Sequence, residues 1–313
     1  MGRYLISRVA GVVGVLIAVS FITFVLMKAV PGGPFDIMTL NTSVIIPDEV
    51  KVILNAKYGL DKPVITQYLL FMKNAVRLDF GYSFFFQGQT VLQIFQEQWP
   101  YSIQLGLMTM GFSIVVGMGL GIAAGMKPGT WVDFTGTAVA LFCLAMPSFV
   151  FALLLQIVFS LRLGWFPTGG WTEPRMWVLP VLANSLAPVL ILQRFTRSSV
   201  LDVIRSNYVR TARAKGMPTS RVTFIHVFKN ALTPILTVGG PMLAGLITGS
   251  FFIETIFRIP GIGQYWVTAI GQRDYPLIMA TTIAWTAIIS VTYLLTDLAY
   301  AVIDPRVTFV REK

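Results

Sequence analysis

Residues 101–126 read YSIQLGLMTMGFSIVVGMGLGIAAGM and contain no charged side chain. At a rise of about 1.5 Å per residue, a helix of this length exceeds the roughly 30 Å hydrocarbon core of a bilayer. Lipid offers the backbone no hydrogen-bond partner, so a helix is the structure expected for such a run. The stretch therefore predicts a membrane-spanning helix.

The composition of the whole chain agrees with this prediction. Of 313 residues, 55% are hydrophobic and 12% are charged, and the mean hydropathy is +0.72. An average soluble domain carries about 25% charged residues. Six apolar runs are long enough to cross a bilayer, and they are 9–27, 101–126, 134–161, 176–193, 234–253 and 276–303. We therefore expect an all-α integral membrane protein with six transmembrane helices.

The distribution of Lys and Arg predicts the orientation of these spans. With the N-terminus in the cytoplasm, the inner segments hold 14 basic and four acidic residues, whereas the outer segments hold ten basic and nine acidic residues. Inner loops of membrane proteins are enriched in Lys and Arg. We therefore expect both termini to be cytoplasmic, in a cell (inner or cytoplasmic) membrane. The net charge of +10 needs no nucleic-acid partner to explain it.

The spans divide the chain into four expected regions. They are an N-terminus and first span at 1–30, an external segment at 31–100, five further spans at 101–303 with a cytoplasmic loop at 201–229, and a cytoplasmic tail at 304–313. The external loop 254–275 is too apolar for a free linker, and we expect it to fold back onto the helices.

The external segment has signals for two amphipathic helices. One starts at Pro47-Asp48-Glu49 and stops at Gly59. The second follows Pro63, and its proposed face comprises Val64, Gln67, Tyr68, Phe71, Ala75 and Leu78. Such helices either pack on the outer mouth of the protein or lie at the lipid surface. We prefer packing, because the apolar faces are modest and the polar faces carry mixed charge.

A basic element interrupts the apolar chain between the fourth and fifth expected spans. Residues 210–221 read RTARAKGMPTSR. Ser206-Asn207 can cap a short helix that runs to Lys215, Gly216 can end it, and Pro218 allows a new start. A second helix follows, with Val222, Ile225 and Phe228 on one face. The pattern predicts a cytoplasmic helix–turn–helix, although a solvated basic loop that only fixes topology would carry the same charge.

Several catalytic and metal-binding motifs are missing from the sequence. The chain contains no G-x-x-x-x-G-K-[ST], H-E-x-x-H, G-x-S-x-G or C-x-x-C. Its single histidine, His226, has no neighbouring Cys or carboxylate in the sequence, and its single cysteine, Cys143, lies in an apolar run. We therefore expect no enzymatic activity, no catalytic residues, no metal and no cofactor bound by this chain.

Polar residues in the spans are candidates for a substrate path. Gln156, Asn184 and Gln193 lie in otherwise apolar runs. They either line a polar pathway or form interhelical hydrogen bonds. Asp297, near the end of the last span, is interpreted as a functional residue or as a cap near the headgroups.

Taken together, the motifs resemble those of ABC importer permeases of the peptide branch, B-type subunit, and most closely the oligopeptide member. The cytoplasmic element resembles the EAA loop of this family, whose general pattern is E-A-A-x-x-x-G. Its glycine falls on Gly216 and its second alanine on Ala212, but its glutamate position is Arg210. Further motifs lie along nearly the whole chain and include VPGGPF (30–35), MPSF (146–149), PGIGQ (260–264), RDY (273–275) and YAVIDPR (300–306).

This resemblance implies a type I ABC importer permease fold and a function in peptide uptake, most closely of oligopeptides, by alternating access. It implies a homologous C-type permease, two ATPase subunits that bind ATP and Mg, an external substrate-binding protein, peptide substrate and the lipid bilayer as partners. The ATPase-coupling residues would then be Arg210, Thr211, Ala212, Arg213, Ala214, Lys215, Gly216, Met217 and Pro218.

Two other classes of membrane protein compete with this interpretation. A secondary transporter of a small solute would be expected to show intramembrane charge and often inverted repeats, and the sequence shows little of either. A membrane enzyme would need a catalytic cluster. Copurification with an ATPase would distinguish the importer from both.

Overall fold

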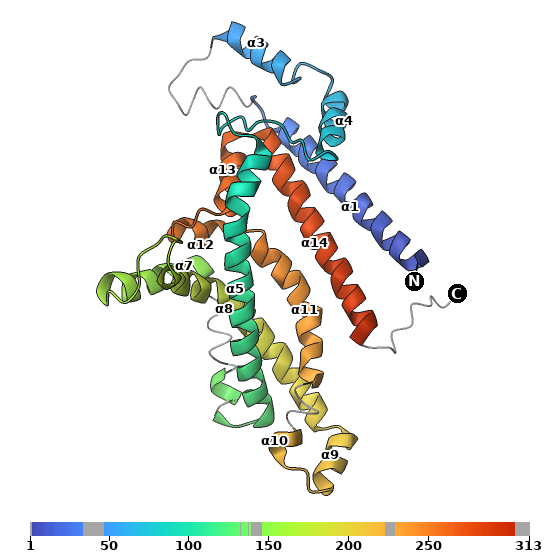
Figure 1. Cartoon of the computed structure of the whole chain (residues 1–313), viewed down its shortest axis with the longest axis vertical. Coiled ribbons are helices and arrows are strands. Elements are labelled where there is room, and N and C mark those ends of the chain that lie inside the picture. Colours follow the sequence, from blue (N-terminus) through green and yellow to red (C-terminus); the bar gives the residue numbers. More distant parts are fainter. Residues whose placement is uncertain are drawn as a thin grey trace. The chain divides into compact units, whose positions relative to one another are not determined.

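The computed structural model describes residues 2–33, 47–131, 133–136, 138, 146–222 and 229–303. Within these ranges the regular structure is helical, apart from one isolated bridge between Tyr82 and Thr90 (Figure 1). The helices are α1 (Gly2–Ala29), α3 (Asp48–Lys57), α4 (Val64–Ala75), α5 (Val91–Met126), α7 (Ser148–Leu155), the π-helix η1 (Gln156–Arg162), α8 (Pro174–Ile204), α9 (Asn207–Ala214), α10 (Thr219–Val222), α11 (Lys229–Ile247), α12 (Phe251–Ile256), α13 (Ile262–Gln272) and α14 (Tyr275–Ile303). The all-α prediction is confirmed.

Four of these helices are long and apolar enough to cross a bilayer. They contain the segments Ile6–Ala29, Val91–Met126, Pro174–Ile204 and Tyr275–Leu298. Two shorter apolar helices, Ser148–Arg162 and Val238–Ile247, fall in the third and fifth expected runs. Part of the third run, 139–145, lies outside the described residues. The chain is thus a multi-pass membrane protein, while the count of six spans stays a prediction.

Helix α8 is longer than the apolar run that predicted it. The run ends at Gln193, but the helix continues through Arg194 and Arg197 to Ile204. Thr196, Val200 and Val203 remain buried along this extension, so its packing face does not stop where charge begins. Hydropathy alone therefore marked the end of the apolar run and missed the end of the helix.

Contacts divide the chain into two compact units, each of which combines distant parts of the sequence. The first comprises Met1–Pro100 and Gly261–Val291, and the second comprises Tyr101–Pro260 and Thr292–Lys313. Helices α5 and α14 each contribute residues to both units.

In the second unit, glycines on one face of α5 permit close contact with α8. A Cβ atom at Gly117 would lie 2.7 Å from the carbonyl oxygen of Val189, and one at Gly121 would lie 2.6 Å from Cβ of Thr196. Both distances are too short for real carbon atoms. The spacing of four residues repeats at Gly125, so the three positions share one helix face. Small residues of this kind allow membrane helices to pack backbone against backbone.

In the first unit, Arg273 is the left-handed C-cap of α13, with φ 53°. This conformation normally favours glycine. The side chain explains why arginine stands here, because its Nη1 donates hydrogen bonds to the carbonyl oxygens of Pro31 and Gly32. The next residue but one, Tyr275, places its ring 5.2 Å from the ammonium group of Lys28. The predicted external loop is therefore tied to the end of α1.

Between these two residues, Asp274 joins another segment to the start of α14. Its carboxylate is fully buried and accepts hydrogen bonds from the Ser83 hydroxyl and from the Phe85 N–H. It also accepts a bond of 3.3 Å from the N–H of Leu277 in the first turn of α14. A buried carboxylate is expensive unless it is hydrogen-bonded, and these donors satisfy it. The expectation that loop 254–275 packs onto the helices is confirmed.

Candidate functional site

Helix α9 carries most of the predicted coupling residues, and one of its faces is anchored in the protein. Val209 and Ala212, three residues apart, are buried. They join a hydrophobic cluster that includes Met118 of α5, Val200 of α8 and Val222 of α10. The basic stretch is therefore not a solvated loop. It is a short helix packed on the end of α8 (Figure 1).

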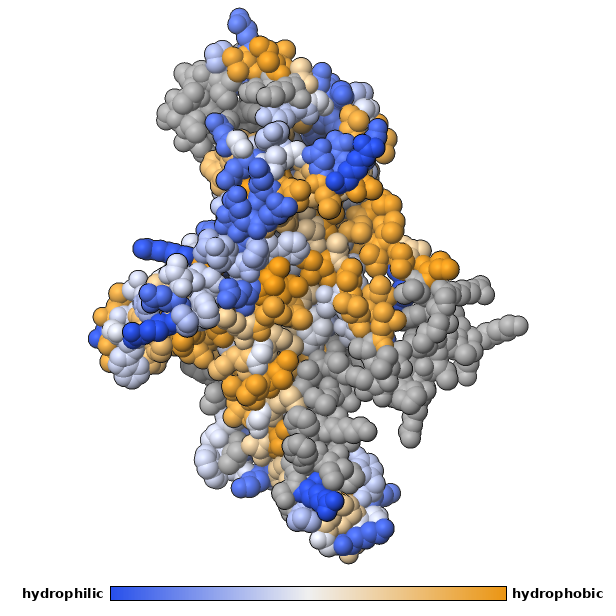
Figure 2. Space-filling view, viewed as in Figure 1, coloured by the Kyte–Doolittle hydropathy of each residue, from blue (hydrophilic) through white to orange (hydrophobic). Residues whose placement is uncertain are grey.

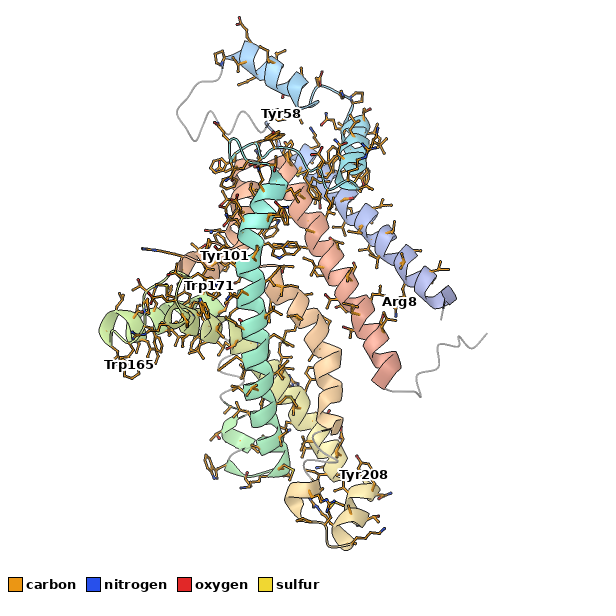
Figure 3. The ribbon with its side chains drawn as sticks, in the orientation of Figure 1. Arg8, Tyr58, Tyr101, Trp165, Trp171 and Tyr208 are labelled. Carbon is orange, nitrogen blue, oxygen red and sulfur yellow. The ribbon has the colours of Figure 1, made fainter. Side chains whose placement is uncertain are left out.

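The other faces of α9 do not contribute to this hydrophobic cluster. Arg210, Arg213 and Lys215 are exposed, as are Thr211 and Ala214. Tyr208 stands beside them with 48% of its surface exposed (Figure 3). A short helix that is fixed on one side and basic on the other is suited to contact a soluble partner with an acidic or carbonyl-rich surface.

Gly216 ends α9 as predicted. Its φ is +79°, and its N–H donates to the carbonyl oxygen of Arg213 at 2.9 Å. The N–H of Met217 donates to the carbonyl oxygen of Ala212 at 3.1 Å. This pair of bonds is the Schellman motif, in which a left-handed residue follows the helix. The chain then turns through Pro218 into α10.

The predicted cap at the other end of α9 is wrong in its detail. Ser206 occupies the N-cap position but makes no side-chain cap hydrogen bond. Its hydroxyl donates instead to the carbonyl oxygen of Val203, in the last turn of α8. The short connection between the helices makes this carbonyl the nearer partner. Of the predicted second helix, Val222 is buried in α10, whereas Ile225, His226 and Phe228 lie outside the described residues.

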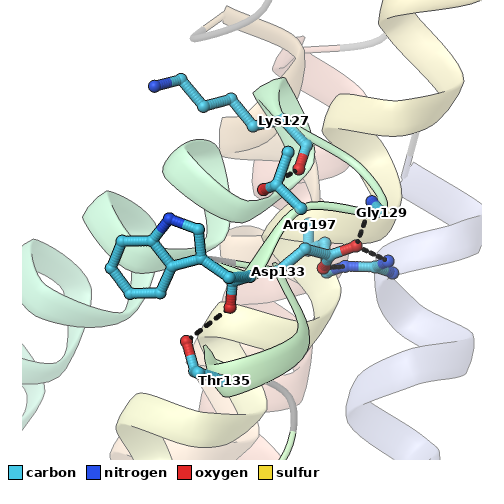
Figure 4. A network of polar contacts seen from close by, with 7 residues as sticks. Lys127, Gly129, Asp133, Thr135 and Arg197 are labelled. Atoms are coloured by element: carbon cyan, nitrogen blue, oxygen red, sulfur yellow. Dashed lines mark hydrogen bonds and ion pairs between the residues drawn. The ribbon is translucent and has the colours of Figure 1, made fainter.

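An ion pair braces the helix that carries α9. Arg197 of α8 donates from Nε to Oδ1 of Asp133 and from Nη2 to Oδ2 at 2.8 Å (Figure 4). The N–H of Gly129 donates to Oδ2 at 3.0 Å. The Arg197 side chain and the Gly129 N–H lower the pKa of the Asp133 carboxyl to about 2. A bidentate pair of this type fixes the relative orientation of the two side chains in addition to pairing their charges.

The three candidate substrate-path residues do not converge on one site. Gln156 opens η1, and its amide donates to the carbonyl oxygens of Thr168 and Ile256. Asn184 donates to the Thr109 hydroxyl at 3.3 Å, and Gln193 is buried two turns further along α8. For Gln156 and Asn184 these contacts correspond to the second interpretation, hydrogen bonds between elements. The substrate path itself stays a prediction.

A buried carboxylate in the second unit was not identified as a site from the sequence. Glu254 is fully buried in the first turn of α12, where a helix favours negative charge. Its Oε1 accepts hydrogen bonds from the Ser102 hydroxyl at 2.7 Å and from the Ser250 N–H at 3.1 Å. Ser102 lies 152 residues away, so sequence spacing gave no signal for this pair.

The first unit contains two neighbouring cavities beside the predicted external helices. One, of about 500 Å³, is lined by residues that include Lys28, Gly32 and Asp61. The other, of about 320 Å³, is lined in part by aromatic residues, including Tyr58 and Phe84, together with Gln67. Both helices of this segment form where predicted, as α3 and α4, and Gly59 ends the first with φ 66°. Within the described ranges no group of three His, Cys, Asp or Glu residues is arranged to hold a metal ion.

Known proteins match this chain along nearly its whole length. The family described as binding-protein-dependent transport system inner membrane component matches residues 117–309, and the corresponding N-terminal family matches residues 1–106. The dipeptide transport system permease protein DppB of Bacillus subtilis is 38% identical over 307 residues, which cover 98% of each chain.

Two oligopeptide permeases are similarly close. The oligopeptide transport system permease protein OppB of Salmonella typhimurium is 37% identical over 311 residues, covering 99% of this chain and all of that protein. AppB of Bacillus subtilis, also an oligopeptide transport system permease protein, is 36% identical over 319 residues. The chain therefore belongs to the family of binding-protein-dependent transport system inner membrane components.

Proposed function

We propose that this chain is a permease subunit of an ATP-driven importer that moves peptides, and oligopeptides in particular, into the cytoplasm. The observation that carries the proposal is its likeness, over nearly the full length, to permeases of dipeptide and oligopeptide transport systems. The packed, basic α9 supports it, because an importer of this class needs a contact to its energy source.

The proposed complex assigns the chemistry to other subunits. A homologous C-type permease completes the translocation path, and an external binding protein delivers the peptide. Two ATPase subunits bind ATP and Mg and hydrolyse the nucleotide. This chain supplies part of the path and the contact that reports the state of the ATPases. Its termini lie in the cytoplasm, on the side of the basic segments.

In this proposal α9 transmits movement because it cannot shift alone. Val209 and Ala212 share a cluster with Val200 of α8 and Met118 of α5, so displacing α9 displaces those helices. A close-packed interior resists independent movement of its parts. ATP binding changes the equilibrium between inward-open and outward-open forms only as far as the ATPase contacts favour one of them. To move such an equilibrium from 1:99 to 99:1 takes about 5.5 kcal/mol of differential binding.

The test is peptide uptake by the complete complex in proteoliposomes. We expect uptake of a labelled oligopeptide that requires the binding protein and ATP on the α9 side, and that stops when the ATPase subunits are inactivated. Uptake by this chain without ATPases, driven by an ion gradient, would establish the alternative of a secondary transporter. A control substrate, such as a free amino acid of the same charge, distinguishes peptide transport from general leakage.

A further inference from the structure

Helix α4 is fastened to α1 by a buried tyrosine. Tyr68 is 6% exposed, and its hydroxyl lies 2.9 Å from the Ser20 hydroxyl. The same tyrosine hydroxyl donates to the carbonyl oxygen of Ile17 at 3.3 Å. The rings of Phe21 and Phe24 lie 5.4 and 5.5 Å from the Tyr68 ring, centre to centre. Tyr68 of the predicted face is thus packed as expected, whereas Val64 and Leu78 of that face are exposed, and Leu78 lies beyond the end of α4.

The depth of this contact along α1 is unusual for a helix of an external segment. The uncharged run of α1 extends from Val9 to Met27, between Arg8 and Lys28. Its 19 residues give about 28 Å of helix, close to the hydrocarbon thickness of a bilayer. Ser20 lies eight residues before Lys28, or about 12 Å along the axis. Tyr68 therefore contacts α1 beside the membrane-spanning run rather than beyond its end.

The face of α4 about a quarter turn from this contact is apolar and exposed. Ile65 is 56% exposed, Leu69 is 60% exposed and Val76, directly after the helix, is 83% exposed. Spacings of four and seven residues place the three side chains along one line of the helix. Lys73 and Arg77 are exposed towards the C-terminal end of the same helix. An apolar stripe with cationic residues at its border is typical of helices that lie in the membrane interface.

The surface of α1 beside the Tyr68 contact is also apolar and exposed. Ile22 is exposed and Phe21, which contacts Tyr68, is partly exposed, and few residues of the α1 span are buried inside the protein. Figure 2 shows hydrophobic side chains along α1. Lipid must cover that surface of α1 where no other protein does, and α4 lies against the same helix (Figure 1). Lipid is therefore the expected occupant of the α4 stripe, because α4 packs against a membrane-spanning helix whose exposed surface is apolar.

We propose that α4 is embedded in the leaflet at the C-terminal end of α1. Ile65, Leu69 and Val76 contact phospholipid acyl chains, while Lys73 and Arg77 extend to the phosphate groups. Long basic side chains can bury their carbon chains and keep the charge in the headgroup layer. The first unit is thereby held at a fixed depth by a helix that does not span the membrane. This inference does not depend on the transported substrate.

The test measures spin-label accessibility in the complete complex, reconstituted in nanodiscs of phosphatidylcholine and phosphatidylglycerol. Labels are placed by Leu69→Cys or Val76→Cys in a Cys143→Ala background. Ile22→Cys on α1 is the lipid-facing reference, and Asn74→Cys, half a turn from the stripe on α4, is the opposite-face reference. Dioxygen collects in hydrocarbon, whereas a water-soluble nickel chelate does not.

We expect the Leu69 and Val76 labels to favour oxygen over the nickel chelate, as the Ile22 label does and the Asn74 label does not. A preference for the nickel chelate at Leu69 and Val76 would show that the stripe faces water. Protection from both reagents would show that a protein covers it, whether the homologous permease or the binding protein. Either of the last two results overturns the proposal. Unchanged peptide uptake by each labelled variant confirms that the folded complex was measured.

Discussion

At the residue scale, Gly216 makes a prediction about the turn after α9. A β-branched residue at φ +79° suffers backbone strain of about 1–2 kcal/mol, although a Cβ atom there meets no other atom within 4 Å. Gly216→Val should therefore displace the turn, weaken ATPase copurification and reduce uptake, while the helices still insert. Gly164→Val is the matched control, because Gly164 has φ 64° and equal space but lies in the loop after η1. Equal losses in both variants would assign the effect to general strain.

A second residue-scale prediction concerns the Asp133–Arg197 pair. Asp133→Asn leaves Arg197 without its charged partner, which we expect to cost about 1–3 kcal/mol of stability. Helix α8 should then be held less firmly in its orientation, so that more ATP is hydrolysed per peptide imported. Exchanging the two residues, Asp133→Arg with Arg197→Asp, should restore part of the lost coupling. If both variants keep the wild-type ratio of ATP to peptide, the pair does not position α8.

The acid dependence of this pair follows from the lowered pKa of Asp133. Its value in the folded protein, about 2, lies below the ordinary 3.8. A carboxyl of this kind stabilises the fold above its unfolded pKa, and the contribution disappears as pH falls towards the folded value. The difference in stability between wild type and Asp133→Asn should therefore stay constant from pH 5 to 8 and shrink below about pH 4. Thermal unfolding across that range measures it.

At the element scale, the exposed basic face of α9 predicts the chemistry of its partner. Arg210→Glu should weaken copurification of the ATPases, because it reverses charge on a surface that we expect to meet an acidic or carbonyl-rich groove. Arg162→Glu is the control, since it makes the same change at the exposed end of η1. Docking that survives Arg210→Glu unchanged would place the contact elsewhere.

Much of this element was predictable from the sequence, and the reasons are local. A Gly-x-Pro break predicts the end of a helix, and Gly216 provides it. The buried face of α9, formed by Val209 and Ala212, was not predicted and is known from the structure. The partner of Arg197 was not predictable, because Asp133 lies 64 residues away and only the folded chain brings the two together. The continuation of α8 past Gln193 was missed for a related reason, since buried contacts rather than hydropathy sustain it.

At the scale of the whole molecule, the predicted orientation can be measured with a membrane-impermeant thiol reagent. In a Cys143→Ala background, Asp61→Cys and Lys127→Cys place single thiols at exposed positions of the predicted outer and inner segments. We expect the first to react in intact cells and the second only after the membrane is opened. Reaction of both from the same side would contradict the proposed topology. The number of spans was inferred from hydropathy. This labelling tests whether an odd number of spans separates the two labelled positions, as predicted.

The discontinuous first unit also has a consequence for how the chain is made. Arg273 binds Pro31, and Asp274 binds Ser83, across sequence separations of 242 and 191 residues. The 160 residues of 101–260 must be synthesised before these partners exist. At ribosomal rates of about 5–20 residues per second, that is a delay on the order of 10 to 30 s. During this interval the newly inserted α1 has no native contact from α13 or α14. The insertion machinery or lipid must therefore cover its surface until these two helices are translated.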